Sequence, residues 1–147
     1  MDSVAMRVSS VLLATSHIQR SSGPYLPRDI ANSLWAFAHL DFEHPAILWA
    51  VSDHFVQESR CSRVGNWSTQ DIANCAWSFA VLRHKPAVLF EAIGEMVDAR
   101  LHRFTPQGLA SSLWALAKVE YVDDALLVRV ALLVTGRVTE YHAHDLS

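Results

Sequence analysis

A short motif recurs three times along this chain, and its recurrence limits the possible folds more than any other feature. The copies occupy residues 27–38, 69–80 and 106–117 and align without gaps. Each has a tryptophan at its ninth position, Trp35, Trp77 or Trp114, so that successive copies are 42 and 37 residues apart. A repeat of this length is typical of helical repeat proteins, in which one small unit stacks on the next.

Each copy of the motif has the pattern of an amphipathic helix. At about 100° per residue, the apolar positions of the first copy fall within one arc of roughly 160°. These positions are Ile30, Ala31, Leu34, Trp35, Phe37 and Ala38, and their equivalents in the other copies are also apolar. Ser68 and Thr105 are favourable N-cap residues, and they predict helices that begin at Thr69 and Pro106. Pro27 is predicted to begin the first helix, although Leu26 is a poor cap.

The second half of each unit also has apolar residues at helical spacing. These halves cover residues 45–60, 86–103 and 123–141, and short loops connect them to the first halves. Short connections favour antiparallel neighbours. A single hairpin of this length cannot bury both of its apolar faces, whereas stacked hairpins can. The sequence therefore predicts an all-α protein, an α-solenoid of stacked antiparallel helical hairpins with about three repeats and partial units at both ends.

The repeat register divides the chain, which we expect to form a single solenoid segment over residues 1–147. Residues 1–26 are predicted to be the second helix of a preceding repeat and a linker, with a transit peptide as the alternative. The three full repeats are predicted at residues 27–68, 69–105 and 106–142, and residues 143–147 fit the start of a truncated repeat. Because neither end resembles a polar cap, we expect a piece of a longer array whose uncapped ends self-associate. The register also leaves open whether Met1 is the true start.

Composition and motifs exclude several classes of protein. Half of the residues are apolar and 18% are charged, which excludes intrinsic disorder. The two cysteines cannot form a disulfide scaffold, and the longest apolar run, residues 125–134, is too short to cross a membrane. No catalytic signature or cofactor motif is present, and His142 and His144 have no third metal ligand at a suitable spacing. We therefore expect neither an enzyme nor a metal site.

The motif resembles the octotricopeptide repeat. It is equally similar to the related heptatricopeptide repeats and to the helical repeats of FAST-kinase-like proteins. The residues that carry the resemblance are 29–38 and 105–118, and the similarity extends over about residues 27–147. This resemblance implies an RNA-binding solenoid in mitochondria or chloroplasts that acts in RNA processing, stability or translation. Nothing in the chain matches the small nuclease-like domain found at the end of many such proteins.

Helical-hairpin RNA binders read about one base per repeat with two or three side chains from one helix. The polar arc of the first helix is the candidate here, because Asn, Gln and Ser can pair with base edges. The candidate residues are Arg28, Asn32, Ser33, Gln70, Asn74, Cys75, Gln107, Ser111 and Ser112. Arg28, Arg83, Lys85 and Lys118 are predicted to lie near one edge and to contact phosphates. The alternative is that these are ordinary solvated or capping residues.

The tryptophans of the motif lie within the apolar arc, so we expect Trp35, Trp77 and Trp114 in the core. Trp67, just before a helix cap, fits either a hydrophobic staple or an exposed stacking platform. The net charge of −3 excludes a strongly basic, general nucleic-acid binder. It favours a second hypothesis, a protein-interaction scaffold, for example in ribosome or ribonucleoprotein assembly. Salt dependence separates the two, because phosphate contacts weaken steeply with salt.

Overall fold

The computed structural model describes residues 26–61, 66–121 and 123–144, and this part of the chain contains helices and no strand. The all-α class predicted from the sequence is confirmed. The predicted units over residues 1–25 and 145–147 lie outside the described residues. The helices are α2 (Pro27–His39), α3 (Pro45–Arg60), α4 (Thr69–Val81), α5 (Ala87–Ala99), the 3-10 helix η2 (Leu101–Arg103), α6 (Pro106–Lys118) and α7 (Asp124–His144).

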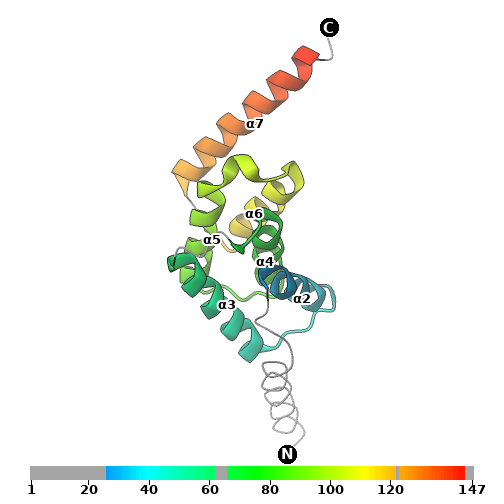
Figure 1. The fold of residues 1–147 in the computed structure, drawn as a ribbon, viewed down its shortest axis with the longest axis vertical. Coiled ribbons are helices and arrows are strands. Elements are labelled where there is room, and N and C mark those ends of the chain that lie inside the picture. Colours follow the sequence, from blue (N-terminus) through cyan, green and yellow to red (C-terminus); the bar gives the residue numbers. More distant parts are fainter. Residues whose placement is uncertain (1–25, 62–65, 122, 145–147) are drawn as a thin grey trace, which may run out of the picture.

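The three motif helices α2, α4 and α6 lie next to one another. In Figure 1, α4 lies between α2 and α6 and packs on both of them. On the other side of the molecule, α3 packs on α5. The last helix, α7, projects away from the rest toward the C-terminus (Figure 1).

The motif helices begin where the sequence predicted. Ser68 Oγ accepts a hydrogen bond from the backbone N–H of Asp71, and the Asp71 carboxylate accepts one from the backbone N–H of Ser68. Thr105 caps α6 through a single bond, in which Thr105 Oγ1 accepts from the backbone N–H of Gly108. Leu26 makes no side-chain cap for α2, as expected of an apolar residue at that position.

The three motif helices also end alike. Asp41, Arg83 and Glu120 occupy equivalent positions after the three helices, and each has a positive φ, between 50° and 62°. The backbone N–H of the next residue, Phe42, His84 or Tyr121, bonds to the carbonyl five residues back. This closure turns the chain directly from the first helix of each unit toward the second.

Burial along the motif helices shows which face meets which neighbour. The fifth and twelfth positions are buried in α2 and α4 but exposed in α6, where they are Ala110 and Ala117. The seventh and tenth positions are buried in α4 and α6 but exposed in α2, where they are Ser33 and Ala36. The first set therefore faces the following motif helix and the second faces the preceding one. A Cβ built on Gly108 of α6 would lie 3.8 Å from Cβ of Ala73 in α4, which agrees with this assignment.

An aromatic residue two positions before each of the later motif helices packs into the core. Trp67 precedes α4 and Phe104 precedes α6, and both are buried. The ring of Trp67 makes an edge contact with Phe55 of α3, with a centroid distance of 4.7 Å. Trp67 is therefore a packing residue, which excludes the exposed stacking platform that its sequence also allowed.

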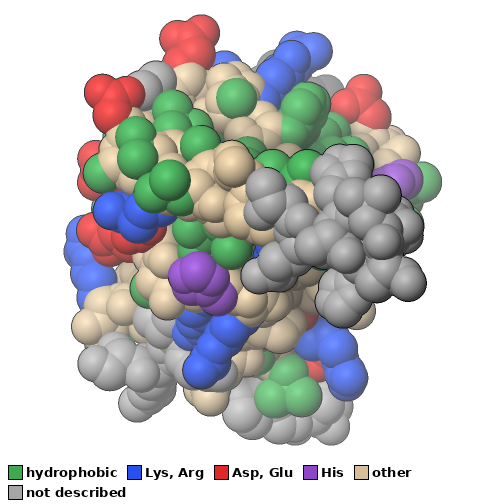
Figure 2. All heavy atoms as spheres, turned by 90° about the horizontal axis from the view of Figure 1, so that it is seen from above, with side chains coloured by type: hydrophobic (Ala, Val, Ile, Leu, Met, Phe, Trp, Pro, Cys, Tyr) green, Lys and Arg blue, Asp and Glu red, His purple; other side chains and the backbone are tan. Residues whose placement is uncertain are grey.

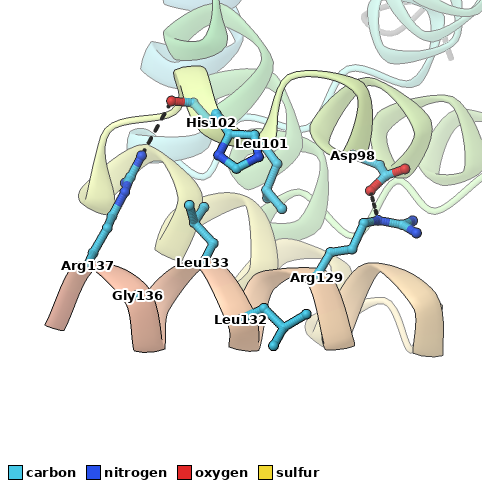
Figure 3. Close-up of a pocket in the computed structure, with 8 residues that line it drawn as sticks. All are labelled: Asp98, Leu101, His102, Arg129, Leu132, Leu133, Gly136 and Arg137. Carbon is cyan, nitrogen blue, oxygen red and sulfur yellow. Dashed lines mark hydrogen bonds and ion pairs between the residues drawn. The ribbon is translucent and has the colours of Figure 1, made fainter. Parts of the chain in front are cut away.

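The second helices differ from one another more than the motif helices do. α3 covers the predicted residues 45–60, whereas α5 ends at Ala99 and is followed by η2. α7 continues through Ala143 and His144, where a further repeat was predicted to start. Two polar contacts join α7 to the preceding unit (Figure 3): Arg129 pairs with Asp98 at 2.5 Å, and Arg137 donates to the carbonyl of His102. None of the described helices is both long enough and apolar enough to span a membrane.

Candidate nucleic-acid interface

One face of the α2–α4–α6 layer carries the second, sixth, ninth and thirteenth residues of each motif helix. These residues form what we call the outer strip. Its members are Arg28, Asn32, Trp35 and His39 in α2, Gln70, Asn74, Trp77 and Val81 in α4, and Gln107, Ser111, Trp114 and Lys118 in α6. All twelve are exposed or half-buried, even in α4, which is covered on both sides by its neighbours. The strip is therefore the solvent face of the layer.

The outer strip includes six of the residues that the sequence singled out for base contacts. Arg28, Gln70 and Gln107 occupy its second positions and are exposed. Asn32, Asn74 and Ser111 occupy its sixth positions and are exposed or half-buried. Within α4, Gln70 Nε2 donates a hydrogen bond to Asn74 Oδ1 over 2.8 Å, which orients both amides on this face.

The seventh position of the motif helices does not belong to the strip. The prediction that Cys75 and Ser112 contact RNA bases was therefore wrong. Both are fully buried against the preceding motif helix, so neither can reach a base. Burial raises the pKa of the Cys75 thiol well above its usual range, and nearby Asp71 adds to the shift. Ser112 Oγ donates to the carbonyl of Gly108 within its own helix. Ser33, the equivalent residue in α2, is exposed and donates to the carbonyl of Asp29, but it lies on the face that packs in the other copies.

The predicted cations are all exposed, but they do not form one edge. Arg28 is the second residue of α2, at the N-terminal end of the layer. Lys118 is the last residue of α6, and Arg83 and Lys85 follow the C-terminal end of α4. Because the motif helices lie side by side, Arg28 is separated from the other three by the length of a helix, about 1.5 Å for each of 13 residues.

The expectation that the motif tryptophans lie in the core holds in part for Trp77, which is half-buried and packs against the core, and is wrong for Trp35 and Trp114. Trp35 is 45% exposed and Trp114 is 46% exposed, while Trp77 is half-buried. The ninth position lies at the edge of the arc, about 20° from the second position and about 60° from the sixth. The large indoles therefore emerge beside the amides. Sequence reasoning missed them because it treated the arc as uniformly buried, although their angular position already indicated an edge.

Aromatic rings line up across the junction between α2 and α4. The ring centroid of His39 is 3.8 Å from that of Trp35 in its own helix and 5.1 Å from that of Trp77 in the next helix. His39 Nδ1 lies 3.1 Å from the carbonyl oxygen of Trp35. The three rings form a ladder that runs from one motif helix to the next. At the α4–α6 junction the equivalent of His39 is Val81, so the ladder is not continued by a ring there.

The charge of the outer strip differs from that of the whole chain. The chain has a net charge of −3, but the strip holds Arg28, Lys118 and His39 and no acidic residue. The two acidic residues of the motif helices, Asp29 and Asp71, lie elsewhere, at the third position, and Asp71 is held by the capping box with Ser68. A strip of exposed indoles, amides and a few cations can stack on bases, bond to their edges and attract phosphates.

A hollow of about 590 Å³ lies elsewhere, between α5, η2 and α7. Asp98, Arg129, His102 and Arg137 contribute to its lining (Figure 3), and the Asp98 and Arg129 side chains pair with each other. Among the described residues there is no cluster of three metal-ligating side chains. The outer strip is therefore the better candidate for a binding surface.

Comparisons of this chain with protein-family models, with curated proteins and with solved structures give no match.

Proposed function

We propose that this chain is a segment of an α-solenoid that binds single-stranded RNA on the outer strip. The observation that carries the proposal is the row of exposed or half-buried tryptophans at the ninth position of three successive helices, beside polar side chains at the second and sixth positions. Indole rings stack on any base, and amides discriminate among base edges. The strip itself has no acidic residue, so no carboxylate of the strip would lie beside a bound phosphate.

Base contacts in this proposal come from two rows. Trp35, Trp77 and Trp114 provide stacking, while Asn32, Asn74 and Ser111 provide hydrogen bonds. The change from Asn to Ser in the third repeat alters the donors and acceptors there and so the preferred base. The chain has no catalytic role in this proposal. By the resemblance of its motif we place its activity in mitochondria or chloroplasts, which microscopy of the chain fused to a fluorescent protein tests.

The experiment is fluorescence anisotropy with a random pool of short single-stranded RNA. Base–aromatic stacking contributes about 1–3 kcal/mol per base, so we expect the double variant Trp35→Ala, Trp114→Ala to weaken binding at least about 25-fold. Trp49→Ala is the matched control, because Trp49 is 53% exposed but lies on α3 away from the strip. Circular dichroism of each variant verifies that the helices are retained.

Salt titration provides an independent readout. The strip has two permanent cations, Arg28 and Lys118, and single-stranded RNA gives a slope of about −0.7 per phosphate contact. We therefore expect the logarithm of the affinity to fall with a slope of about −1.4 against the logarithm of salt.

Equal loss of binding in Trp49→Ala and in the double variant would contradict the assignment to the strip.

A protein-binding scaffold, for example in ribosome or ribonucleoprotein assembly, is the second candidate function. The net charge of −3 favours it, since it opposes general attraction to nucleic acid. Exposed tryptophans are also enriched at protein interfaces. Failure of a demonstrably helical sample to bind RNA would support the scaffold in place of RNA binding.

A further inference from the structure

The face of α6 that points away from α4 is flanked by α7, but among the described residues no further motif helix packs on it. Ala110 and Ala117 are exposed there, whereas their equivalents in α2 and α4 are covered by the next motif helix. These equivalents are Ala31 and Ala73 for Ala110, and Ala38 and Ala80 for Ala117. α7 adds further apolar surface beside them, including Val134 and Val138. Figure 2 views the molecule from this end and shows hydrophobic side chains on the surface.

A cavity of about 440 Å³ opens on this face between α6 and α7. Its apolar lining includes Leu109, Ala110 and Leu113 from α6 and Leu133, Val134 and Val138 from α7. In the first unit, the place of Leu133 is taken by Phe55, on which Trp67 packs. In the first unit the equivalent site is filled by Trp67, the aromatic residue that precedes the next motif helix, α4.

The opposite end of the layer carries the complementary face. In α2 the seventh and tenth residues, Ser33 and Ala36, are exposed, whereas their equivalents in α4 and α6 are buried against the preceding motif helix. Asp29 has the same position as Asp71, which is buried in that contact. The residue two positions before α2 is Tyr25, an aromatic residue like Trp67 and Phe104.

We propose that these two ends bind each other, so that α2 of a second copy packs on α6 in the register that joins α4 to α2 and α6 to α4. The contact is head-to-tail, since each copy uses a different face at each end, and it allows further copies to add in a row. It is independent of RNA binding.

A second copy fits this face better than an unrelated partner for two reasons. The face accepts a helix with small residues at the seventh and tenth positions and an aromatic residue just before it, and α2 presents that pattern. The same contact is also made twice within the chain, at the α2–α4 and α4–α6 junctions. A new junction would thus continue an existing interface.

Directed disulfide formation tests the register. The Cβ position at Gly108 is 3.8 Å from Cβ of Ala73, which is about the mean Cβ separation in disulfides. The equivalent pair across the proposed junction is Asp29 of one copy and Ala110 of the other. We would prepare Asp29→Cys and Ala110→Cys as separate proteins, each with Cys61→Ser to remove the exposed native thiol.

Mixing the two proteins in a glutathione redox buffer is expected to give a covalent dimer that neither protein forms alone. The matched control is Asn32→Cys mixed with Ala110→Cys, because Asn32 is exposed on the same helix but lies on the outer strip. Cross-linking of Ala110→Cys to itself would show a symmetric dimer and overturn the head-to-tail register. Equal cross-linking with the Asn32→Cys control would also overturn it.

Sedimentation velocity tests the association without introduced cysteines. The unmodified chain is expected to sediment faster as its concentration rises, and Ala110→Glu is expected to remain monomeric. Since Ala110 is exposed, its replacement leaves the core of the monomer unchanged. Gln107→Glu, on the outer strip of the same helix, adds the same charge and is expected to associate as the unmodified chain does. A chain that stays monomeric over a hundredfold concentration range would refute the proposal.

Discussion

Gly94 of α5 lies directly against the ring of Tyr121, which follows α6. A Cβ atom built on Gly94 would be 2.8 Å from Cε1 of Tyr121 and 2.9 Å from its hydroxyl oxygen. Tyr121 reaches this place because Glu120 before it has a positive φ and turns the chain back toward the preceding unit. His84, at the equivalent position, lies against Ser52 of α3, with 3.3 Å between His84 Nε2 and Ser52 Oγ. The turn residue of each later unit thus joins it to the second helix of the unit before.

The first prediction concerns the contact between Gly94 and Tyr121. Alanine is favoured over glycine by about 1 kcal/mol in a helix interior, but in this chain the new methyl group must displace the ring. We expect Gly94→Ala to stabilise the Tyr121→Ala protein by about 1 kcal/mol and to stabilise the unmodified protein less or to destabilise it. Urea denaturation of the four proteins measures the coupling, which we expect to be at least about 0.5 kcal/mol. Additive effects of the two changes would show that the ring is not held against Gly94.

The second prediction concerns the missing cap of α2. Leu26 is 54% exposed and leaves the first backbone N–H groups of α2 without a side-chain acceptor. A serine there can accept from the third residue of the helix, as Ser68 does for α4, so we expect Leu26→Ser to stabilise the protein by about 0.5–1 kcal/mol. The matched control is Leu40→Ser at the other end of the same helix, where Leu40 is 75% exposed. An equal gain in both variants would show that the stabilisation comes from removing an exposed apolar side chain and not from capping.

The third prediction concerns pH. Burial lowers the pKa of His84 below its usual 6.5, and the opposing effect of Asp53 is smaller. The unfolded chain therefore takes up a proton at this residue at a higher pH than the folded chain does. The neutral imidazole supports the fold above pH 6.5, and this contribution is lost as the pH falls from 6.5 through the lowered pKa.

Urea denaturation at a series of pH values measures this loss. His84→Gln retains a hydrogen-bonding group toward Ser52 but does not titrate, so its stability is expected to fall less between pH 7 and pH 5. Parallel curves for the two proteins would indicate that other groups account for the acid sensitivity.

The fourth prediction concerns the two cysteines. Cys75 is buried at the α2–α4 junction and burial raises its pKa, whereas Cys61 is exposed at the end of α3. Because the thiolate is the reactive form, we expect one thiol per native chain to react promptly with a disulfide reagent and the second to react only after unfolding. Cys61→Ser is expected to abolish the prompt reaction and to leave the slow one. Rapid reaction of Cys75 in that variant would show that the junction opens readily.

Much of the fold could be predicted because local features specify it. The apolar arc, the caps Ser68 and Thr105 and the prolines at the helix starts predicted α2, α4 and α6 at their observed places. These signals act within a few residues, so they can be recognised in the sequence without knowledge of the tertiary structure. The extent of α7 was predicted less well, because the second half of the third repeat was expected to end near residue 141, whereas the helix continues to His144.

The candidate site was only partly predictable, because exposure on a stacked helix depends on its neighbours. The sequence by itself determined that Asn74, Cys75 and Trp77 recur in a helical motif, and it separated the polar residues from the apolar ones. Only the tertiary structure decided that Cys75 is buried while Trp77 faces outward with Asn74. The physical reason is that α4 has neighbours on two sides, so its small polar positions are covered by α2. A helix wheel gives the angle of each side chain, but the packing of α2 and α6 decides which angles meet solvent.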